Sequence, residues 1–549
     1  MDSYFDLGAH SRAITTPSEQ AQRWFDRGLN WTFGFNHNEA IACFQRALEA
    51  DPACVMAHWG ICYAIGPNYN YTWPDFPYRE KQKAVTMFQQ HYAAALAGVE
   101  QASPQEQALI RALAARNIEQ AEIEDFQPYT EAYAQEMRAV YQQHPTDLDI
   151  CALTAEALMG RTPWMLWDLQ SGTPAEQAST AEAMTLMETA FANDPAAMRH
   201  PGLLHMYIHL MEMSPHPERA LKAGDALTVL VPDAGHLQHM ATHIDVLCGE
   251  YSNVVARNKR AWQADQKYLA EHGPFTFYTT YVCHNLHFQL YGAMFLGQIG
   301  PALEAADHLE NLLTPEVIEP VADWKESYFP MRLHALIRFG QWDAIKAYTP
   351  PADTELYAYT HAVSAYAKAV ACAASGDVAG AEQHRATFYP AKAAVPETRL
   401  LFNNLCSDLL NIGAEMLEGE LAYRKGDYDT AFAHLRRSVE LDDTLPYAEP
   451  WGWMQPSRHA LGALLLEQGR VEEAEAVYRA DLGLDGKLAR ACQNPDNVWA
   501  LHGLHECLMK TGQMAEAHLI KQRLDIANAR ADRPIRASCF CRLEHEPPA

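Results

Sequence analysis

The sequence predicts an all-α solenoid of antiparallel helix pairs that is interrupted by aromatic loop insertions. The chain has 549 residues, of which 48% are hydrophobic and 20% charged, enough apolar material for a large folded body. Glycine, alanine and aromatic residues recur with the spacing of a 34-residue helix-pair repeat near both ends. Between these ends, turn glycines such as Gly249, Gly297 and Gly340 punctuate further helical sequence. We therefore expect helix pairs throughout.

The clearest repeat spans residues 21–54 and follows the tetratricopeptide pattern. The matching residues are Trp24, Gly28, Ala40, Phe44, Ala47 and Pro52. Gly28 allows the first helix to approach its partner closely, and Pro52 ends the second helix. Asn36, His37 and Glu39 fall in the turn between them, where capping is the expected role. The segment therefore predicts a helical hairpin.

Similar spacings predict a second array toward the C-terminus. They comprise Gly462, Ala474 and Tyr478, then Trp499, Gly503 and Ala515, and a weaker copy at Gly419 and Ala431. Three insertions rich in Trp, Tyr, Pro and Gly lie at 66–80, 160–178 and 442–457, and we expect them to be ordered loops. We expect a lead-in at 1–20, a solenoid over 21–410 with a histidine-rich groove at 200–290, a C-terminal array over 411–530 and a tail at 531–549.

Composition also bears on partners and location. The formal net charge is -27, without a Lys/Arg-rich run, which argues against nucleic acid as a partner. The N-terminal segment lacks the pattern of a signal peptide, and the sequence lacks a stretch of about 18 apolar residues, so we expect a cytoplasmic protein and no membrane partner. Most of the 12 cysteines, including Cys43, Cys54 and Cys62, are expected to be buried thiols.

Histidines gather in one short region. Seven of the 25 histidines lie between His200 and His243. The segments 202–210 and 236–244 align with His205 over His239 and His209 over His243, each pair 34 residues apart. Because residues one repeat apart occupy equivalent places on neighbouring helices, the four imidazoles are predicted to converge in the concave groove. Within each pair, i,i+4 spacing on one helix face brings the Cβ atoms to about 5–6 Å.

This arrangement predicts a metal site. Neutral imidazole is a ligand for borderline metals, so Cu, Zn or Fe is expected rather than Mg or Ca. His205, His209, His239 and His243 are the predicted ligands, and His287, His284 or Glu156 is expected to complete the shell. His236 and Glu212 lie nearby as further candidates. Histidines of this kind can instead bind an acidic peptide or form hydrogen bonds in a core.

Two other groups of residues are weaker candidates for a functional site. Trp164, Trp167 and Asp168, in the second long insertion, could cover the groove or simply pack. Cys539 and Cys541 could bind a metal or a redox partner, although terminal cysteines are more often inert.

The segments FNHNEAIACFQRALEADPACVMAHWGICYAIGPNYN, SPHPERALKAGDALTVLVPDAGHLQHMATHIDVLCGEY and ASCFCR resemble a group of bacterial and fungal tetratricopeptide-domain proteins. The resemblance spans nearly the whole chain. It implies the helix-pair architecture, together with H-x-x-x-H and AGHLxHMxxHI elements carried by His205, His209, His236, His239 and His243. It implies no particular reaction.

Two functions follow as hypotheses. The first is a metalloprotein. As an enzyme, it would be a metal-dependent hydrolase or oxidoreductase that acts on a small molecule. The second is a non-catalytic scaffold that binds a peptide or protein in its concave groove. The sequence does not indicate the substrate, the metal or the oligomeric state.

Overall fold

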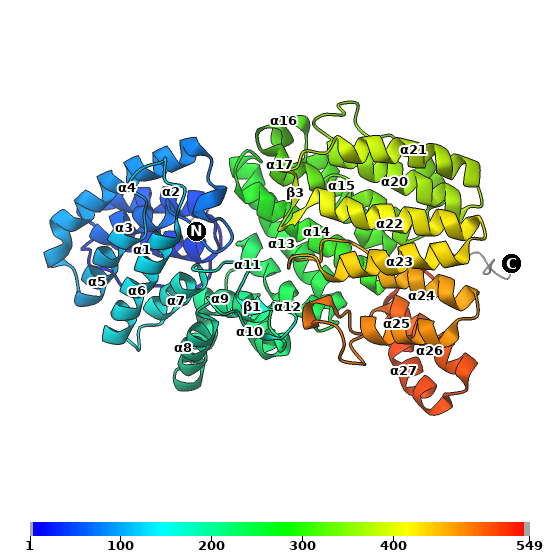
Figure 1. Ribbon diagram of the computed structural model, residues 1–549. Coiled ribbons are helices and arrows are strands. Elements are labelled where there is room, and N and C mark those ends of the chain that lie inside the picture. Colours follow the sequence, from blue (N-terminus) through cyan, green and yellow to red (C-terminus); the bar gives the residue numbers. More distant parts are fainter. Residues whose placement is uncertain (1–3, 543–549) are drawn as a thin grey trace. The chain divides into compact units, whose positions relative to one another are not determined.

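The computed structural model describes residues 4–542, and most of these residues are in helices. Two two-stranded antiparallel sheets, β1–β2 and β3–β4, are the sheets found in this part of the chain. The chain divides into two compact units, residues 1–244 with 263–267 and residues 245–262 with 268–549. Each unit is built from antiparallel helix pairs (Figure 1), which confirms the predicted all-α fold class.

The first unit begins with the N-terminal segment and contains the repeat predicted at 21–54. Its elements are α1 (Glu19–Phe33), α2 (His37–Ala50), α3 (Val55–Ala64), η1 (Trp73–Asp75), α4 (Tyr78–Gly98), η2 (Val99–Gln101), α5 (Pro104–Ala112), η3 (Leu113–Ala115), α6 (Gln127–Gln143), α7 (Leu148–Met159), β1 (Trp167–Asp168), β2 (Thr173–Pro174), α8 (Thr180–Asn193), η4 (Ala197–Arg199), α9 (Pro201–Met211), η5 (Pro217–Ala220), α10 (Leu221–Leu227) and α11 (Gly235–His239). Two helices, α12 (Ala241–Leu247) and α13 (Tyr251–His272), contribute residues to both units.

The second unit holds the remaining elements. They are α14 (Tyr278–Leu296), α15 (Ile299–Leu312), α16 (Pro315–Ile318), η6 (Glu319–Val321), α17 (Ala322–Lys325), η7 (Glu326–Tyr328), α18 (Met331–Arg338), α19 (Trp342–Ala347), α20 (Ala358–Ala374), α21 (Val378–Ala393), β3 (Leu400–Leu401), β4 (Asn404–Leu405), α22 (Cys406–Arg424), α23 (Tyr428–Asp443), α24 (Ser457–Glu467), α25 (Val471–Asp481), η8 (Arg490–Cys492), α26 (Val498–Thr511) and α27 (Met514–Arg530). In Figure 1, α20 to α23 lie side by side as two successive hairpins.

Close packing of glycine against an aromatic ring explains the repeat pattern at 21–54. A Cβ atom at Gly28 would lie 2.5 Å from the ring of Phe44, and one at Gly60 would lie 2.6 Å from the same ring. Phe44 therefore fills the space that the two glycines leave between α1, α2 and α3. Asn36 caps α2 by accepting a hydrogen bond from the backbone N–H of Glu39, as the sequence predicts.

The same device recurs in the second unit. Cβ atoms at Gly462 and Gly503 would lie 2.5 and 2.2 Å from the ring of Tyr478, which is fully buried. Tyr478 on α25 thus packs against glycines of α24 and α26. This matches the predicted C-terminal repeats, in which the same three residues supply the spacing.

The aromatic insertions are ordered and packed. Trp73 and Trp453 are buried, and Trp167 Nε1 donates a hydrogen bond of 2.7 Å to the backbone carbonyl of Leu210. None of the helices in residues 4–542 combines the length and apolarity that crossing a bilayer requires. Cys43, Cys54 and Cys62 are buried free thiols, as predicted, whereas Cys539 and Cys541 form a disulfide with each other.

Candidate metal centre

The histidine-rich region occupies three short helices. His205 and His209 lie on α9, His236 and His239 on α11, and His243 on α12. Pro201 stands at the first position of α9, where a missing N–H has no cost, and His200 caps that helix. All five of these imidazoles are buried, with exposed fractions of at most 1%. They occupy buried positions rather than the surface of an open groove.

The second His-x-x-x-His motif does not lie on one continuous helix, so that prediction is wrong. Helix α11 ends at His239, and α12 begins at Ala241. The backbone N–H of His243 bonds to the carbonyl of Met240, three residues back, at 3.2 Å. This tighter turn rotates the chain between the two histidines. His236, in the first turn of α11, lies against His205 of α9.

Three imidazoles from α9 and α11 lie close together. His205, His209 and His236 each offer a ring nitrogen within 4.8 Å of the others. The Nε2 atoms of His205 and His236 lie 3.2 Å apart. Two ligands of a tetrahedral ion at 2.0–2.1 Å are separated by roughly 3.3 Å, so this spacing suits two nitrogens that share one metal ion.

Hydrogen bonds behind the rings orient two of these nitrogens. His205 Nδ1 lies 2.6 Å from the backbone carbonyl of Phe33, and His209 Nδ1 lies 3.0 Å from Glu212 Oε1. Both partners are acceptors, so each Nδ1 carries the proton and donates it. Each Nε2 therefore presents a lone pair. This is the arrangement by which proteins fix the tautomer of metal-binding histidines.

A chain of hydrogen bonds extends from Glu212 to the remaining histidines. Glu212 Oε2 accepts from His243 Nδ1 at 2.7 Å, and His243 Nε2 lies 2.7 Å from His239 Nε2. The latter distance is a hydrogen-bond length and is shorter than two metal ligands prefer. Thr242 Oγ1, 3.3 Å from His239 Nδ1, continues the chain. His239 and His243 are thus linked to His209 through one buried carboxylate.

The surroundings of this centre are apolar and aromatic. The ring of Phe35 lies 4.4 Å from that of His205 and stacks with His209 and His236 at 6.0 and 5.6 Å, measured between centroids. Tyr69 and Trp164, from two insertions, lie 4.9 and 5.6 Å from His209. Burial lowers the pKa of His205 to about 3, so this imidazole is neutral and able to bind a cation at neutral pH.

Glu156, His284 and His287 were also predicted as ligands. Glu156 on α7 accepts a hydrogen bond of 2.5 Å from the Tyr63 hydroxyl, and within residues 4–542 it joins none of the histidine groups. His284 and His287 belong to α14 in the second unit. There His284 stacks on Phe402, and His287 Nε2 lies 2.7 Å from the sulfur of Met454. Their role as ligands stays a prediction.

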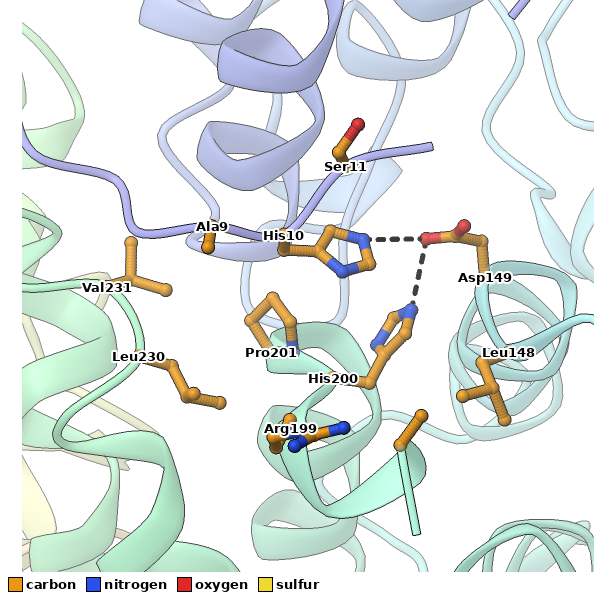
Figure 2. Close-up of a pocket in the computed structure, with 11 residues that line it drawn as sticks. Ala9, His10, Ser11, Leu148, Asp149, Arg199, His200, Pro201, Leu230 and Val231 are labelled. Carbon is orange, nitrogen blue, oxygen red and sulfur yellow. Dashed lines mark hydrogen bonds and ion pairs between the residues drawn. The ribbon is translucent and has the colours of Figure 1, made fainter. Parts of the chain in front are cut away.

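A further group in the first unit resembles a metal site but has the wrong tautomer. In Figure 2, His10 and His200 point to one carboxylate oxygen of Asp149, at 2.9 and 3.0 Å. His200 Nδ1 accepts the backbone N–H of Leu203, so its proton is on Nε2 and is donated to Asp149. A neutral His200 therefore has no lone pair to offer at this point.

This group instead ties the N-terminal segment to the starts of α7 and α9. Burial alone would raise the pKa of Asp149, but hydrogen bonds from His10 and His200 hold it well below its usual range. Arg12 adds an ion pair of 3.0 Å to the second oxygen. The group borders a cavity of about 430 Å³, which Figure 2 shows with Arg199 and Leu230 at its wall.

His236 and Glu212 belong to the centre but were not among the leading ligands predicted from the sequence. Alignment over one 34-residue repeat pairs His205 with His239, whereas the structure pairs it with His236. Both histidines lie on α11, and the repeat spacing does not show which of them faces His205. Glu212 could have been found from its position three residues after His209, because i,i+3 residues are neighbours on a helix. Phe33 acts through its backbone carbonyl, which leaves no mark in the sequence.

Comparison with known proteins adds to the repeat assignment. The family model described as tetratricopeptide repeat matches residues 35–54. No curated protein matches the chain. Among solved structures, the chain is similar to a component of the APC/C hetero-tetramer Cut9–Hcn1 (13% identity, 90% of this chain and 78% of that chain, TM-score 0.32).

Two other similar structures are Naa15/Naa10 bound to HypK-THB (13% identity, 93% of this chain and 70% of that chain, TM-score 0.24) and the human IFIT1 dimer with m7Gppp-AAAA (10% identity, 86% and 90%, TM-score 0.32). TM-scores below 0.5 carry no inference about activity or partners. The chain thus contains a tetratricopeptide repeat in an all-helical fold.

Proposed function

We propose that this protein binds a transition metal ion, Zn, Cu or Fe, through His205, His209 and His236. The observation that carries the proposal is the 3.2 Å approach of two Nε2 atoms, His205 and His236, beside a third imidazole. Because His205 donates its only proton to the Phe33 carbonyl, its Nε2 lone pair points at His236. A cation between the rings stabilises this arrangement, and imidazole nitrogens favour a borderline metal over Mg or Ca.

A chain of hydrogen bonds on the far side of the His209 ring supports the centre. It consists of Glu212, His243 and His239. The carboxylate accepts a hydrogen bond from His209 Nδ1–H and raises the basicity of that ligand, as carboxylate–histidine–metal arrangements do. The hydrogen bond from His243 holds Glu212 in place. In this proposal His239 and His243, which the sequence suggests as ligands, act as supports, and His236 takes a ligand position.

Three nitrogen ligands leave one position of a tetrahedral ion for water, a substrate or a further protein group. An open position is typical of catalytic sites, where the ion acts as a Lewis acid or a redox centre. Phe35, Tyr69 and Trp164 surround this region and favour a site with little bulk water. A metal-dependent hydrolase or oxidoreductase acting on a small molecule is therefore the enzymatic form of the proposal.

The alternative is a non-catalytic scaffold that binds a peptide or protein through its helical repeats. The match to a tetratricopeptide repeat at 35–54 favours it, because such repeats commonly present binding surfaces. In a pure scaffold the histidines form a hydrogen-bonded core without metal. The two functions therefore differ in metal content.

Elemental analysis of protein purified without a metal-affinity tag separates them. We expect one equivalent of metal per chain, lost in the His205→Ala/His236→Ala variant. His216→Ala is the matched control, because His216 lies in the same region but its side chain is 65% exposed. Circular dichroism checks that each variant remains helical. Metal-free wild-type protein whose stability is unchanged by added Zn²⁺, Cu²⁺ or Fe²⁺ would refute the metal proposal.

A further inference from the structure

A second cavity in the first unit is formed by two of the aromatic insertions. It has a volume of about 280 Å³ and is lined by Trp73 and Pro67 of one insertion, Thr162 and Met165 of the other, and Tyr133 of α6. The volume lies just below the ~300 Å³ at which ligand pockets usually begin, so it suits a molecule smaller than a typical drug.

Two ionisable side chains at this cavity are buried without pairing with each other. Arg116 and Glu156 both line it, and their exposed fractions are 7% and 8%. Neither forms an ion pair within 4.0 Å in the part of the chain that the structure describes. A third charged residue, Arg161, is already paired with Glu131. Buried opposite charges normally pair directly, because isolated burial is costly.

The guanidinium of Arg116 is held in place and retains N–H donors that are not used in hydrogen bonds to the described part of the protein. Its Nη2 donates to the backbone carbonyls of Tyr63 and Pro67, and its guanidinium stacks over the rings of Tyr63 and Tyr133 at 3.9 and 5.1 Å. Nε is buried and has no hydrogen-bond acceptor among residues 4–542. A rigid guanidinium with unused N–H groups is suited to a carboxylate.

Glu156 supplies the opposite charge. Its Oε2 accepts the Tyr63 hydroxyl at 2.5 Å, which fixes the carboxyl at the cavity wall. Burial raises its pKa, and the charge of Arg116 opposes this shift. Trp73 and Phe126 also line the cavity, and their rings are available for an apolar body.

We propose that this cavity binds a small zwitterion, an α-amino acid with an aromatic side chain, with its carboxylate on Arg116 and its ammonium group toward Glu156. Such a ligand complements both charges at once, whereas a simple anion or cation would complement only one. The proposal stands on the residues of the cavity and requires no metal. Tyr69, which lines the cavity, also contacts His209, so the two sites are neighbours.

Calorimetric titration of metal-free protein tests the proposal with three probes. These are L-phenylalanine, 3-phenylpropionate, which lacks the ammonium group, and 2-phenylethylamine, which lacks the carboxylate. We expect L-phenylalanine to bind and each analogue to bind at least about tenfold more weakly, because each leaves one buried charge unmatched. Equal binding of 3-phenylpropionate, or no binding of L-phenylalanine at millimolar concentration, would overturn the proposal.

Three variants assign the contacts. Arg116→Met and Glu156→Gln are each expected to weaken L-phenylalanine binding at least about tenfold. Arg161→Met is the matched control, because Arg161 lines the same cavity but its charge is used by Glu131. If Arg116→Met fails to fold, Glu156→Gln and the analogue series on wild-type protein still decide. An equal loss in all three variants would contradict the assignment.

Discussion

Replacing Glu212 by glutamine changes a single oxygen to an NH₂ group and tests whether the carboxylate supports the proposed metal centre. The carboxylate is fully buried and accepts two N–H groups, from His209 at 3.0 Å and from His243 at 2.7 Å. A glutamine side chain has nearly the same shape but only one acceptor oxygen. Its NH₂ group would face the second Nδ1–H, so one imidazole must lose its hydrogen bond or move its proton.

The size of the effect follows from these contacts. A hydrogen bond to a charged group contributes about 1.5–3 kcal/mol, so Glu212→Gln should lower the free energy of unfolding of metal-free protein by about that amount. Loss of a carboxylate behind a metal ligand typically weakens metal affinity about 10–100-fold, which corresponds to about 1.4–2.7 kcal/mol. Both effects should appear in one variant.

Two assays measure these effects. Competition with a chromophoric chelator gives the Zn²⁺ affinity, and urea unfolding of metal-free protein gives the stability. Glu218→Gln is the matched control, since Glu218 is an exposed acid beside His216 and is expected to change neither value. If Glu212→Gln bound Zn²⁺ within twofold of wild type, the carboxylate would not support a metal ligand and the reasoning would be wrong.

Three further predictions concern stability. Asp149→Asn should lower the free energy of unfolding by about 3 kcal/mol, because Asp149 accepts from His10 and His200 and pairs with Arg12, while metal content stays unchanged; urea unfolding and elemental analysis check this. Gly503→Ala should cost about 1–3 kcal/mol, because its Cβ would lie 2.2 Å from Tyr478, and an unchanged melting temperature would speak against this packing. Burial lowers the pKa of His334 to about 4, below the unfolded value of about 6.5, so the unfolded state binds more protons between these values. Stability should therefore fall by up to roughly 3 kcal/mol as pH drops from 6.5 to 4, and a His334→Gln variant that kept the full slope would exclude this origin.

The sequence predicted the helix pairs well because their packing depends on residue size at fixed spacing. A large ring packs against a glycine in both arrays, Phe44 against Gly28 and Tyr478 against Gly462. Each ring fits only because the glycine has no side chain, and the fixed spacing of the two residues is visible as a periodic pattern. The region of the histidine cluster was predicted for the same reason. Repeat alignment placed histidines on successive helices, and the structure brings five of them together.

The sequence did not predict which histidines contact each other. It depends on which face of α11 packs against α9, since His236 rather than His239 approaches His205. It also depends on a backbone carbonyl, that of Phe33, which any residue could provide. The pairing of His10 with Asp149 joins residues 139 positions apart, and no local pattern encodes it. Periodicity therefore gave the scaffold, and tertiary contacts set the chemistry.

The most direct test of the metal centre is anomalous diffraction from crystals of the protein with bound metal, recorded at the absorption edge of the ion identified by elemental analysis. We predict one strong peak about 2.0–2.1 Å from the Nε2 atoms of His205, His209 and His236, with Glu212 accepting a hydrogen bond from His209 Nδ1–H. A peak on other residues, or none while His205 and His236 share a proton, would contradict it.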